Sequence, residues 1–389
     1  MRILHVIPRF PYFGGRTIVG GSASALLTLV LAQQDAGDDV TILSSTPGRV
    51  GAFRIDGGPR VESLASEADR TVGFALRFMW HAMRWLRVNR SRYDVVHVHS
   101  GHADYFLLAA ILRLASGLPT LHSLYCPIDP QGRVSRQLVR TLVRWCGNSI
   151  DFRCGMSNNV RDSMAAFGFQ SVECVRPALD LQRFSPVAGE SPLRRELGVP
   201  PDAVVVLFVG NATPQKNLAG VLRAIHLLLP EFPHLRLVAT TELKHSSTDA
   251  HLTELANLSR QLGLQDRVIM RGIVDNMPEL MRASDILVAP FVDTFGPSDY
   301  FMAALEAMAS GKPVVVSGVG GMKELVSPDV GAQVDPADPE SIAAGLRVFC
   351  SDGTLRERAG RSARRLMEAQ FSPPEIARTY RTIYGRLAP

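Results

Sequence analysis

The chain has 389 residues, of which 46% are apolar, and its 42 basic and 37 acidic residues give a formal net charge of +5. This length predicts two domains, each with its own hydrophobic core. The small positive charge favours anionic ligands and does not indicate nucleic-acid binding. No apolar stretch approaches the roughly 20 residues that a membrane span needs. Five cysteines form no CxxC pair and are expected to be reduced, mostly buried thiols, as in a cytoplasmic protein.

The first half of the chain alternates predicted strands with predicted helices. Residues 3–7 form a continuous apolar run that ends at Pro8, which is typical of a central parallel strand. A Gly-rich loop with Gly20 and Gly21 follows, then a helix, and then a strand over residues 39–43. These segments predict a βαβ unit.

A basic, aromatic helix is predicted over residues 71–92, where large apolar side chains alternate with arginines. Two interpretations remain open. The helix is either a scaffold element with a basic outer face or an element that lies on a membrane surface.

Histidines gather in the next two predicted strands, residues 94–99 and 119–124. His97 and His99 lie on one face of the first of these strands, and for His97 we favour a buried, hydrogen-bonded position. His122 comes just before a loop and is the better candidate for a functional role.

A Pro-rich segment, residues 178–201, predicts a linker, because it has no long apolar period. It separates a predicted N-terminal domain, residues 1–177, from a C-terminal domain, residues 202–372, and a last helix over residues 373–389 is expected to pack back onto the first domain. In the second half, strands are predicted over residues 204–209, 235–239, 268–271 and 285–289. The alternation predicts an α/β fold of two Rossmann-like, doubly wound parallel-sheet domains facing each other across a cleft.

Three loops fit a phosphate-binding role, because ligands of such sheets sit beyond the carboxyl ends of strands, near helix N-termini. They are residues 20–21, 211–216 and 296–301. The second loop also supplies a cation, Lys216, for contact with phosphate. The chain has neither a P-loop nor an intact GxGxxG fingerprint, so a classical NAD site has no support.

The helix that follows the third loop carries one carboxylate, Glu306, in apolar company. Phe301, Met302 and Leu305 recur at helical spacing, so their face is expected to pack inward with Glu306 on it or beside it. A carboxylate in that position needs a partner.

Taken together, these motifs resemble the retaining glycosyltransferases of the two-domain GT-B fold, specifically family 4. The resemblance covers nearly the whole chain and rests on Gly20 and Gly21, on DVVHVH at 94–99, on His122, on Pro177, Asp180, Arg183 and Phe184, and on residues 208–216, 272–285 and 305–325.

The resemblance implies that a sugar moves from a nucleoside-diphosphate donor, expected to be a UDP-sugar, to an acceptor hydroxyl with retention of configuration. Glu306 would accept hydrogen bonds from the ribose hydroxyls, Lys216 would neutralise the diphosphate, and His122 would contact the donor sugar. The family uses neither a metal nor a covalent nucleophile. The other implied donor-binding residues are Gly20, Gly21, Gly210, Asn211, Ser298, Tyr300, Phe301 and Met302. The implied acceptor is a small molecule or a lipid-linked sugar. If the acceptor is a lipid, peripheral contact with the inner membrane face is expected. The protein would be a monomer or a homodimer.

Two positions depart from the family pattern. Ser298 stands where the family has a glutamate, and Asp299 follows it; on a continuous helix Asp299 would lie within about 20° of Glu306. Either Asp299 takes over the sugar-contacting role, or Ser298 and Asp299 only cap the helix. Asn211 stands where the family usually has an arginine, a loss expected to weaken donor binding by about 1–3 kcal/mol unless another cation substitutes.

These departures keep two other hypotheses open beside an active glycosyltransferase. One is a catalytically silent GT-B protein that binds an acceptor or a partner subunit. The other is a nucleotide-sugar epimerase or a sugar phosphorylase on the same fold.

Overall fold

The computed structural model describes the chain apart from residues 15, 16, 19, 66–71, 130–136, 188, 190, 242–245, 273, 296, 297 and 389, and it leaves the side chains of residues 13, 14, 17, 72 and 246–250 undescribed. Gly296, the first residue of the third predicted loop, therefore lies outside the described residues. The chain forms two compact units. The first contains Met1–Leu179, Phe295–Asp299 and Phe371–Pro389, and the second contains Asp180–Thr294 and Tyr300–Gln370.

The first unit is built on an eight-stranded sheet in the order β10-β9-β8-β7-β1-β4-β6-β5. Neighbouring strands are parallel except for β5 and β6, which are antiparallel. The strands are β1 (Arg2–Arg9), β4 (Asp39–Ser45), β5 (Gly51–Arg54), β6 (Arg60–Ser63), β7 (Val95–Ser100), β8 (Thr120–Leu124), β9 (Phe152–Gly155) and β10 (Val172–Cys174). A separate antiparallel pair is formed by β2 (Tyr12–Gly14) and β3 (Thr17–Ile18).

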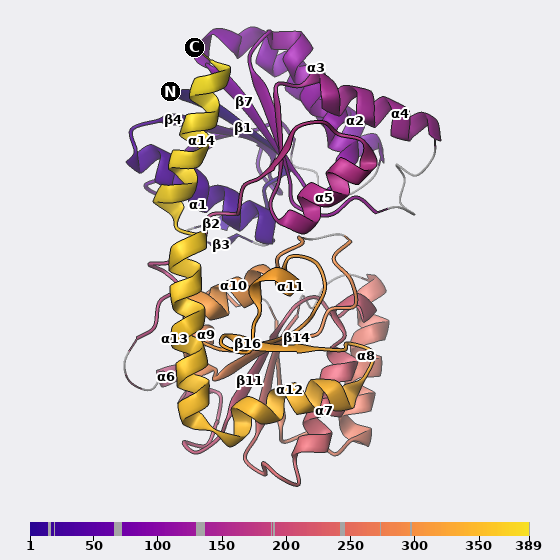
Figure 1. Ribbon diagram of the computed structural model, residues 1–389, viewed down its shortest axis with the longest axis vertical. Coiled ribbons are helices and arrows are strands. Elements are labelled where there is room, and N and C mark those ends of the chain that lie inside the picture. The colour runs from indigo at the N-terminus through magenta and orange to yellow at the C-terminus, as the bar shows by residue number, and fades with distance from the viewer. Residues whose placement is uncertain are drawn as a thin grey trace. The chain divides into compact units, whose positions relative to one another are not determined.

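Helices cover both faces of this sheet (Figure 1). They are α1 (Gly21–Asp35), α2 (Val72–Asn89), α3 (Phe106–Ser116), α4 (Gln137–Ser149), α5 (Asn158–Phe167) and α14 (Pro373–Leu387), with short 3-10 turns at Arg90–Arg92 and Ala103–Tyr105. Helices α1 and α14 pack side by side, and α2, α3 and α4 pack in sequence. Ile3 of β1 packs in the core with α1 and α14, whereas Leu4 packs in the core with α2 and α3. Burial on both faces explains why the strand is apolar throughout.

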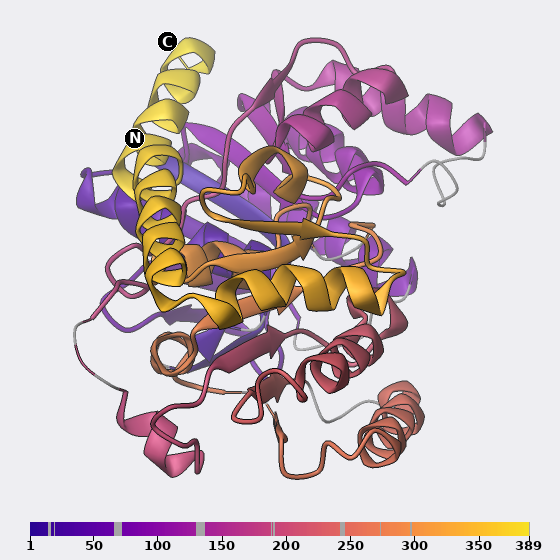
Figure 2. The ribbon, with the colours of Figure 1, turned by 60° about the horizontal axis from the view of Figure 1, so that its bottom comes forward.

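The second unit contains a six-stranded, wholly parallel sheet in the order β13-β12-β11-β14-β15-β16. The strands are β11 (Val205–Val209), β12 (Arg236–Thr240), β13 (Val268–Arg271), β14 (Ile286–Ala289), β15 (Val314–Ser317) and β16 (Gly331–Val334). The helices are α6 (Pro192–Glu196), α7 (Leu218–Leu228), α8 (Ser246–Gln261), α9 (Met277–Ala283), α10 (Met302–Ala309), α11 (Met322–Leu325), α12 (Pro339–Ser351) and α13 (Gly353–Gln370). Helices α7 and α12 lie together on one face, and α10 lies on the other (Figures 1 and 2).

Most predicted elements are confirmed with boundary changes of one to three residues, and two local expectations are wrong. Pro8 does not end the first strand, because β1 continues to Arg9 across an irregularity in its pairing with β4. The predicted Gly-rich loop contains the β2–β3 pair. The Pro-rich segment remains a predicted linker, and within it the short helix α6 starts at Pro192 after the capping residue Ser191.

Two expectations about the whole chain can be compared with the structure. Among the described helices, none has the length and apolar character required to cross a bilayer. All five cysteines are free thiols; four of them are buried and Cys174 is partly exposed.

Candidate functional site

The second unit places its candidate residues where the strand order reverses. Strands β11 and β14 are neighbours in the sheet but not in the sequence, so the segments that leave their carboxyl ends diverge. This reversal is the position at which open parallel sheets bind ligands. The segment after β11 carries Gly210, Asn211 and Lys216, and the segment after β14 leads into α10, which carries Glu306.

The loop after β11 is anchored directly beside Lys216. Asn217 adopts the left-handed conformation with φ of 58°, and its side chain caps α7 by accepting a hydrogen bond from the backbone N–H of Gly220 at 3.1 Å. The same side chain donates to the carbonyl of Pro336 at 2.7 Å. Lys216 is partly exposed, whereas Asn211 is exposed.

Glu306 lies on α10 and is partly exposed. Among the residues that the structure describes, none forms a hydrogen bond or an ion pair with its carboxylate. Burial raises the pKa of Glu306 to about 8; the nearby Arg183 opposes this shift and Asp180 adds to it. The described protein groups thus do not supply the expected partner. A carboxylate with a raised pKa and no protein donor is a candidate for binding the hydrogen-bond donors of a ligand.

The residue at the N-cap of α10 provides no capping hydrogen bond from its side chain. Its N-cap is Phe301, whose side chain makes no capping hydrogen bond, and the alternative in which Ser298 and Asp299 cap this helix remains a prediction. The first N–H groups of a helix have no partner within the helix, which makes this position suited to an anionic ligand. Tyr300, just before the cap, donates its hydroxyl hydrogen bond to Glu324 at 3.2 Å.

Asp299 belongs to the first unit and is fully buried there. Its carboxylate accepts hydrogen bonds from Ser157 Oγ at 2.5 Å and from Asn159 Nδ2 at 2.8 Å, and its N–H donates to the carbonyl of Tyr125 at 2.9 Å. Because α10 begins only at Met302, Asp299 does not share a continuous helix with Glu306. A sugar-contacting role for Asp299 remains a prediction for this residue, whose side chain is buried.

The first unit presents a helix start of its own at Gly20 and Gly21. Gly20 is the N-cap of α1 with φ of 106°, a conformation that residues with a side chain rarely adopt, and Gly21 is the first helical residue. The free N–H groups of this turn are the ones that the sequence predicts to bind phosphate.

His122 is fully buried in β8. Its Nε2 is 2.7 Å from Ser100 Oγ, and its ring centroid is 4.0 Å from that of Phe106. Its Nδ1 has no partner among the described residues, and burial lowers the pKa of the ring to about 3. Contact with a donor sugar remains a prediction for this residue, which has no exposed surface here.

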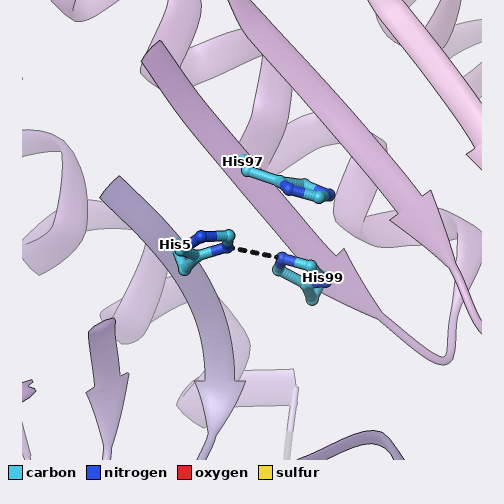
Figure 3. A group of neighbouring side chains, drawn as sticks. All are labelled: His5, His97 and His99. Carbon is cyan, nitrogen blue, oxygen red and sulfur yellow. Dashed lines mark hydrogen bonds between the residues drawn. The ribbon is translucent and has the colours of Figure 1, made fainter. Parts of the chain in front are cut away.

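Three other histidines, His5, His97 and His99, meet between β1 and β7 in the core of the first unit (Figure 3). The Nδ1 of His5 is 3.0 Å from Nε2 of His99, and the rings of His97 and His99 are 3.8 Å apart. Each of the three rings uses both nitrogens in hydrogen bonds to protein groups. To be coordinated by these three histidines, a metal ion would therefore have to displace one hydrogen bond from each ring.

These hydrogen bonds have a defined direction. The Oε1 of Gln33 can only accept, so Nε2 of His5 donates to it at 2.8 Å and Nδ1 of His5 accepts from His99. The Nδ1 of His99 then accepts from the hydroxyl of Tyr125 at 3.1 Å. The amide of Gln33 donates to Tyr384 at 3.3 Å, which also contacts His97 at 2.7 Å. The neutral rings therefore connect α14 to β1 and β7, and the prediction that His97 is buried and hydrogen-bonded is confirmed.

We expect the stability of the first unit to fall as the pH drops below about 6.5. Burial lowers the pKa of His5 to about 4 and that of His97 and His99 well below 6.5, so the unfolded chain binds more protons than the folded chain between these values. Each ring can cost up to about 2 kcal/mol of the free energy of unfolding by pH 5. Urea titrations from pH 7.5 to 5 measure the slope, with His234→Asn as a control at an exposed histidine. A constant free energy over this range would contradict the prediction.

The residues that the sequence predicts to be functional fall in both units. Seven of these residues lie in the second unit, namely Gly210, Asn211, Lys216, Tyr300, Phe301, Met302 and Glu306. Five lie in the first unit, namely Gly20, Gly21, His122, Ser298 and Asp299. Sequence reasoning missed Phe291, whose ring lies against the ammonium group of Lys216, and the Ser157 and Asn159 partners of Asp299.

Comparisons with known families and relatives agree on one group of proteins. Residues 20–177 match the glycosyl transferase 4-like domain, and residues 190–366 match the glycosyl transferases group 1 family. The D-inositol 3-phosphate glycosyltransferase of Streptomyces avermitilis is 31% identical, in an alignment covering 81% of this chain and 69% of that protein. The protein of the same name from Kineococcus radiotolerans is 33% identical, covering 82% and 72%.

Solved structures share the fold. Anabaena HepE in complex with UDP matches with a TM-score of 0.79 at 18% identity, covering 100% of both chains. Sucrose-phosphate synthase from Thermosynechococcus elongatus matches with a TM-score of 0.81 at 19% identity, covering 100% of this chain and 99% of that one.

Proposed function

The chain belongs to the group 1 glycosyltransferases, with the GT-B fold, and on this premise we propose that it moves a sugar from a nucleoside-diphosphate donor to an acceptor hydroxyl with retention of configuration. The observation that carries the proposal is the partly buried carboxylate of Glu306 on the helix that follows β14, which has no partner in the described part of the chain, with Lys216 on the loop that follows the neighbouring strand β11.

Each of the two groups has a distinct task in this proposal. The carboxylate of Glu306 accepts hydrogen bonds from the two ribose hydroxyls, which supply donors that the described protein groups do not. The ammonium of Lys216 and the first N–H groups of α10 stabilise the negative charge that develops on the diphosphate as it leaves. Lys216 thus supplies the charge compensation of a metal-independent reaction.

A screen of nucleoside diphosphates tests this proposal. UDP, the expected leaving group, is compared with ADP, GDP and TDP, and binding to the native state alone raises the melting temperature. We expect one of the four to raise it by several degrees in the wild type and by much less in Glu306→Gln. If none of the four shifts the transition at millimolar concentration, the proposal is wrong. Binding without turnover on any acceptor would favour the catalytically silent alternative, which Ser298 and Asn211 motivate.

The acceptor is proposed to be a small polyol phosphate or a lipid-linked sugar. The names of the Streptomyces and Kineococcus relatives support the first class. Helices α2 and α4 support the second, because neither contains an acidic residue and both expose large apolar side chains. The most exposed of these are Leu76, Trp80 and Val88 on α2 and Leu138 and Trp145 on α4. We propose that this surface makes a peripheral contact with an anionic membrane from the cytoplasmic side.

Reversal of charge on α2 tests the membrane contact. Arg84, which stacks on Trp80 at 4.5 Å, and Arg87 are both exposed. Replacing the two by glutamate is expected to weaken binding to vesicles rich in phosphatidylglycerol at least tenfold, because each basic residue near such a surface contributes about 1 kcal/mol. Vesicle sedimentation measures the change, and the exposed pair Arg223 and Arg358 of the second unit serves as the control. Equal binding of the two charge-reversed variants would leave α2 as a scaffold helix.

A further inference from the structure

The ammonium group of Lys216 lies on the face of an aromatic ring. Its Nζ is 3.7 Å from the ring centroid of Phe291 and 6.0 Å from that of Phe301, and the two rings are 4.1 Å apart. At the first distance the ring attracts the cation through its quadrupole. All three residues belong to the second unit.

The phenyl ring of Phe291 is held firmly relative to the backbone of Lys216. The N–H of Val292 donates to the carbonyl of Gln215 at 2.9 Å, and the side-chain amide of Gln215 donates to Asp293. On the other side of the lysine, Asn217 donates to the carbonyl of Pro290 at 3.3 Å. The loop after β11 and the loop after β14 are therefore fastened to each other on both sides of the lysine.

Burial fixes the ring itself. Phe291 is 3% exposed and Phe301 is 4% exposed, so both rings are packed. The carbonyl of Phe291 accepts a hydrogen bond from Ser317 Oγ at 2.6 Å, which ties the loop to the end of β15. A lysine has four rotatable side-chain bonds and is otherwise mobile. Contact with the packed ring favours the conformation in which the ammonium lies on that ring.

We propose that Phe291 is a positioning residue, which holds the ammonium of Lys216 at the diphosphate position before the donor binds. This inference rests on the proposed function, in which Lys216 stabilises the diphosphate. Lys216 is the only cationic residue in the sequence from Gly210 to Asn217, because Asn211 supplies no charge. When one lysine binds the diphosphate without a second cation, ordering its side chain in advance strengthens binding, because less conformational entropy is then lost when the donor binds.

The proposal predicts an effect that is confined to phosphate-bearing ligands. In Phe291→Leu, which removes the ring and keeps an apolar side chain, the Kd for UDP is expected to rise about three- to tenfold while the Kd for uridine stays the same. In Phe291→Tyr, which keeps the ring, the Kd for UDP is expected to stay within twofold of wild type. A loss of packing alone would weaken both ligands together.

A double-mutant cycle decides the matter. Titration calorimetry with UDP and uridine is carried out on the wild type, Phe291→Leu, Lys216→Ala and the double variant, and thermal unfolding verifies that each is folded. The effect of Phe291→Leu on UDP should disappear in the Lys216→Ala background. If it persists there, or if UDP and uridine weaken equally, Phe291 does not act through Lys216. Should Phe291→Leu fail to fold, Phe291→Met replaces it in the same cycle.

The outcomes also separate this inference from the proposed function. If Lys216→Ala leaves the UDP affinity unchanged, or if the wild type binds none of UDP, ADP, GDP and TDP, the assigned role of the lysine is wrong and the inference falls with it. If another of the four binds in place of UDP, that diphosphate and its nucleoside replace UDP and uridine in the cycle. If Lys216→Ala weakens UDP binding and Phe291→Leu does not, the proposed function stands and only the positioning role is lost.

Discussion

Replacement of Lys216 by alanine is expected to lower kcat by about 10²- to 10³-fold. The side chain lies at the carboxyl end of β11, beside the point where the strand order reverses, and it belongs to the loop that faces the start of α10 across that point. In the proposed reaction the charge on the diphosphate increases as the bond to the sugar breaks. A fixed cation that meets this charge is worth roughly 3–4 kcal/mol in the transition state, which corresponds to the expected loss.

The measurement for Lys216 separates binding from chemistry. Single-turnover rates at saturating donor report the chemical step, and the concentration dependence reports affinity. Lys216→Arg, which keeps the charge, should recover part of the rate. The matched control is Arg223→Ala, at an exposed cationic residue on α7 of the same unit. A rate for Lys216→Ala within about threefold of the wild type would remove the lysine from the chemical step.

The parallel sheets could be predicted because local signals determine them. Ile3 and Leu4 are both apolar since each faces a different core, and this continuous apolar pattern identifies a buried parallel strand. The end of β1 could not be predicted in the same way. Pro8 lacks an N–H group, which usually terminates a strand, but here it lies within an irregular section of the pairing with β4 and the chain stays extended to Arg9.

The candidate site could be predicted only as far as residue type and strand order allow. Glu306 is recognisable because a carboxylate in an apolar helix is unusual, and Lys216 because it follows the strand end at Gly210 in a predicted phosphate-binding loop. The partners of Asp299 were not recognisable, since Ser157 and Asn159 lie about 140 residues away. The contact between Lys216 and Phe291 likewise joins two loops that only the β11–β14 pairing brings together. Such long-range contacts carry no periodic signal.

Replacement of Glu306 by glutamine is expected to weaken ribonucleoside binding about 10- to 100-fold and at the same time to stabilise the protein. An ionised carboxylate accepts charge-assisted hydrogen bonds of about 1.5–3 kcal/mol, whereas the amide of glutamine accepts neutral ones of about 1 kcal/mol. Calorimetry with uridine avoids the titration of phosphate groups. The control is Glu196→Gln, at an exposed carboxylate of the same unit.

The gain in stability follows from the raised pKa of Glu306. This pKa is about 8 in the folded protein, whereas the ordinary value for a glutamate side chain, as in the unfolded chain, is 4.5. Between these values the folded state binds more protons than the unfolded state, so the wild type loses stability as the pH rises from 4.5 to 8. Glu306→Gln lacks this loss, and its melting temperature should exceed that of the wild type by about 2–6 °C at pH 8.5 and equal it near pH 4.5. Uridine affinity should rise with pH towards about 8 in the wild type and stay constant in the variant, because only the ionised carboxylate binds the hydroxyls strongly. Two results would contradict this prediction: a Glu306→Gln variant that is less stable than the wild type at pH 8.5, or a wild-type uridine affinity that does not depend on pH. Either result would show that protein groups already donate hydrogen bonds to the Glu306 carboxylate.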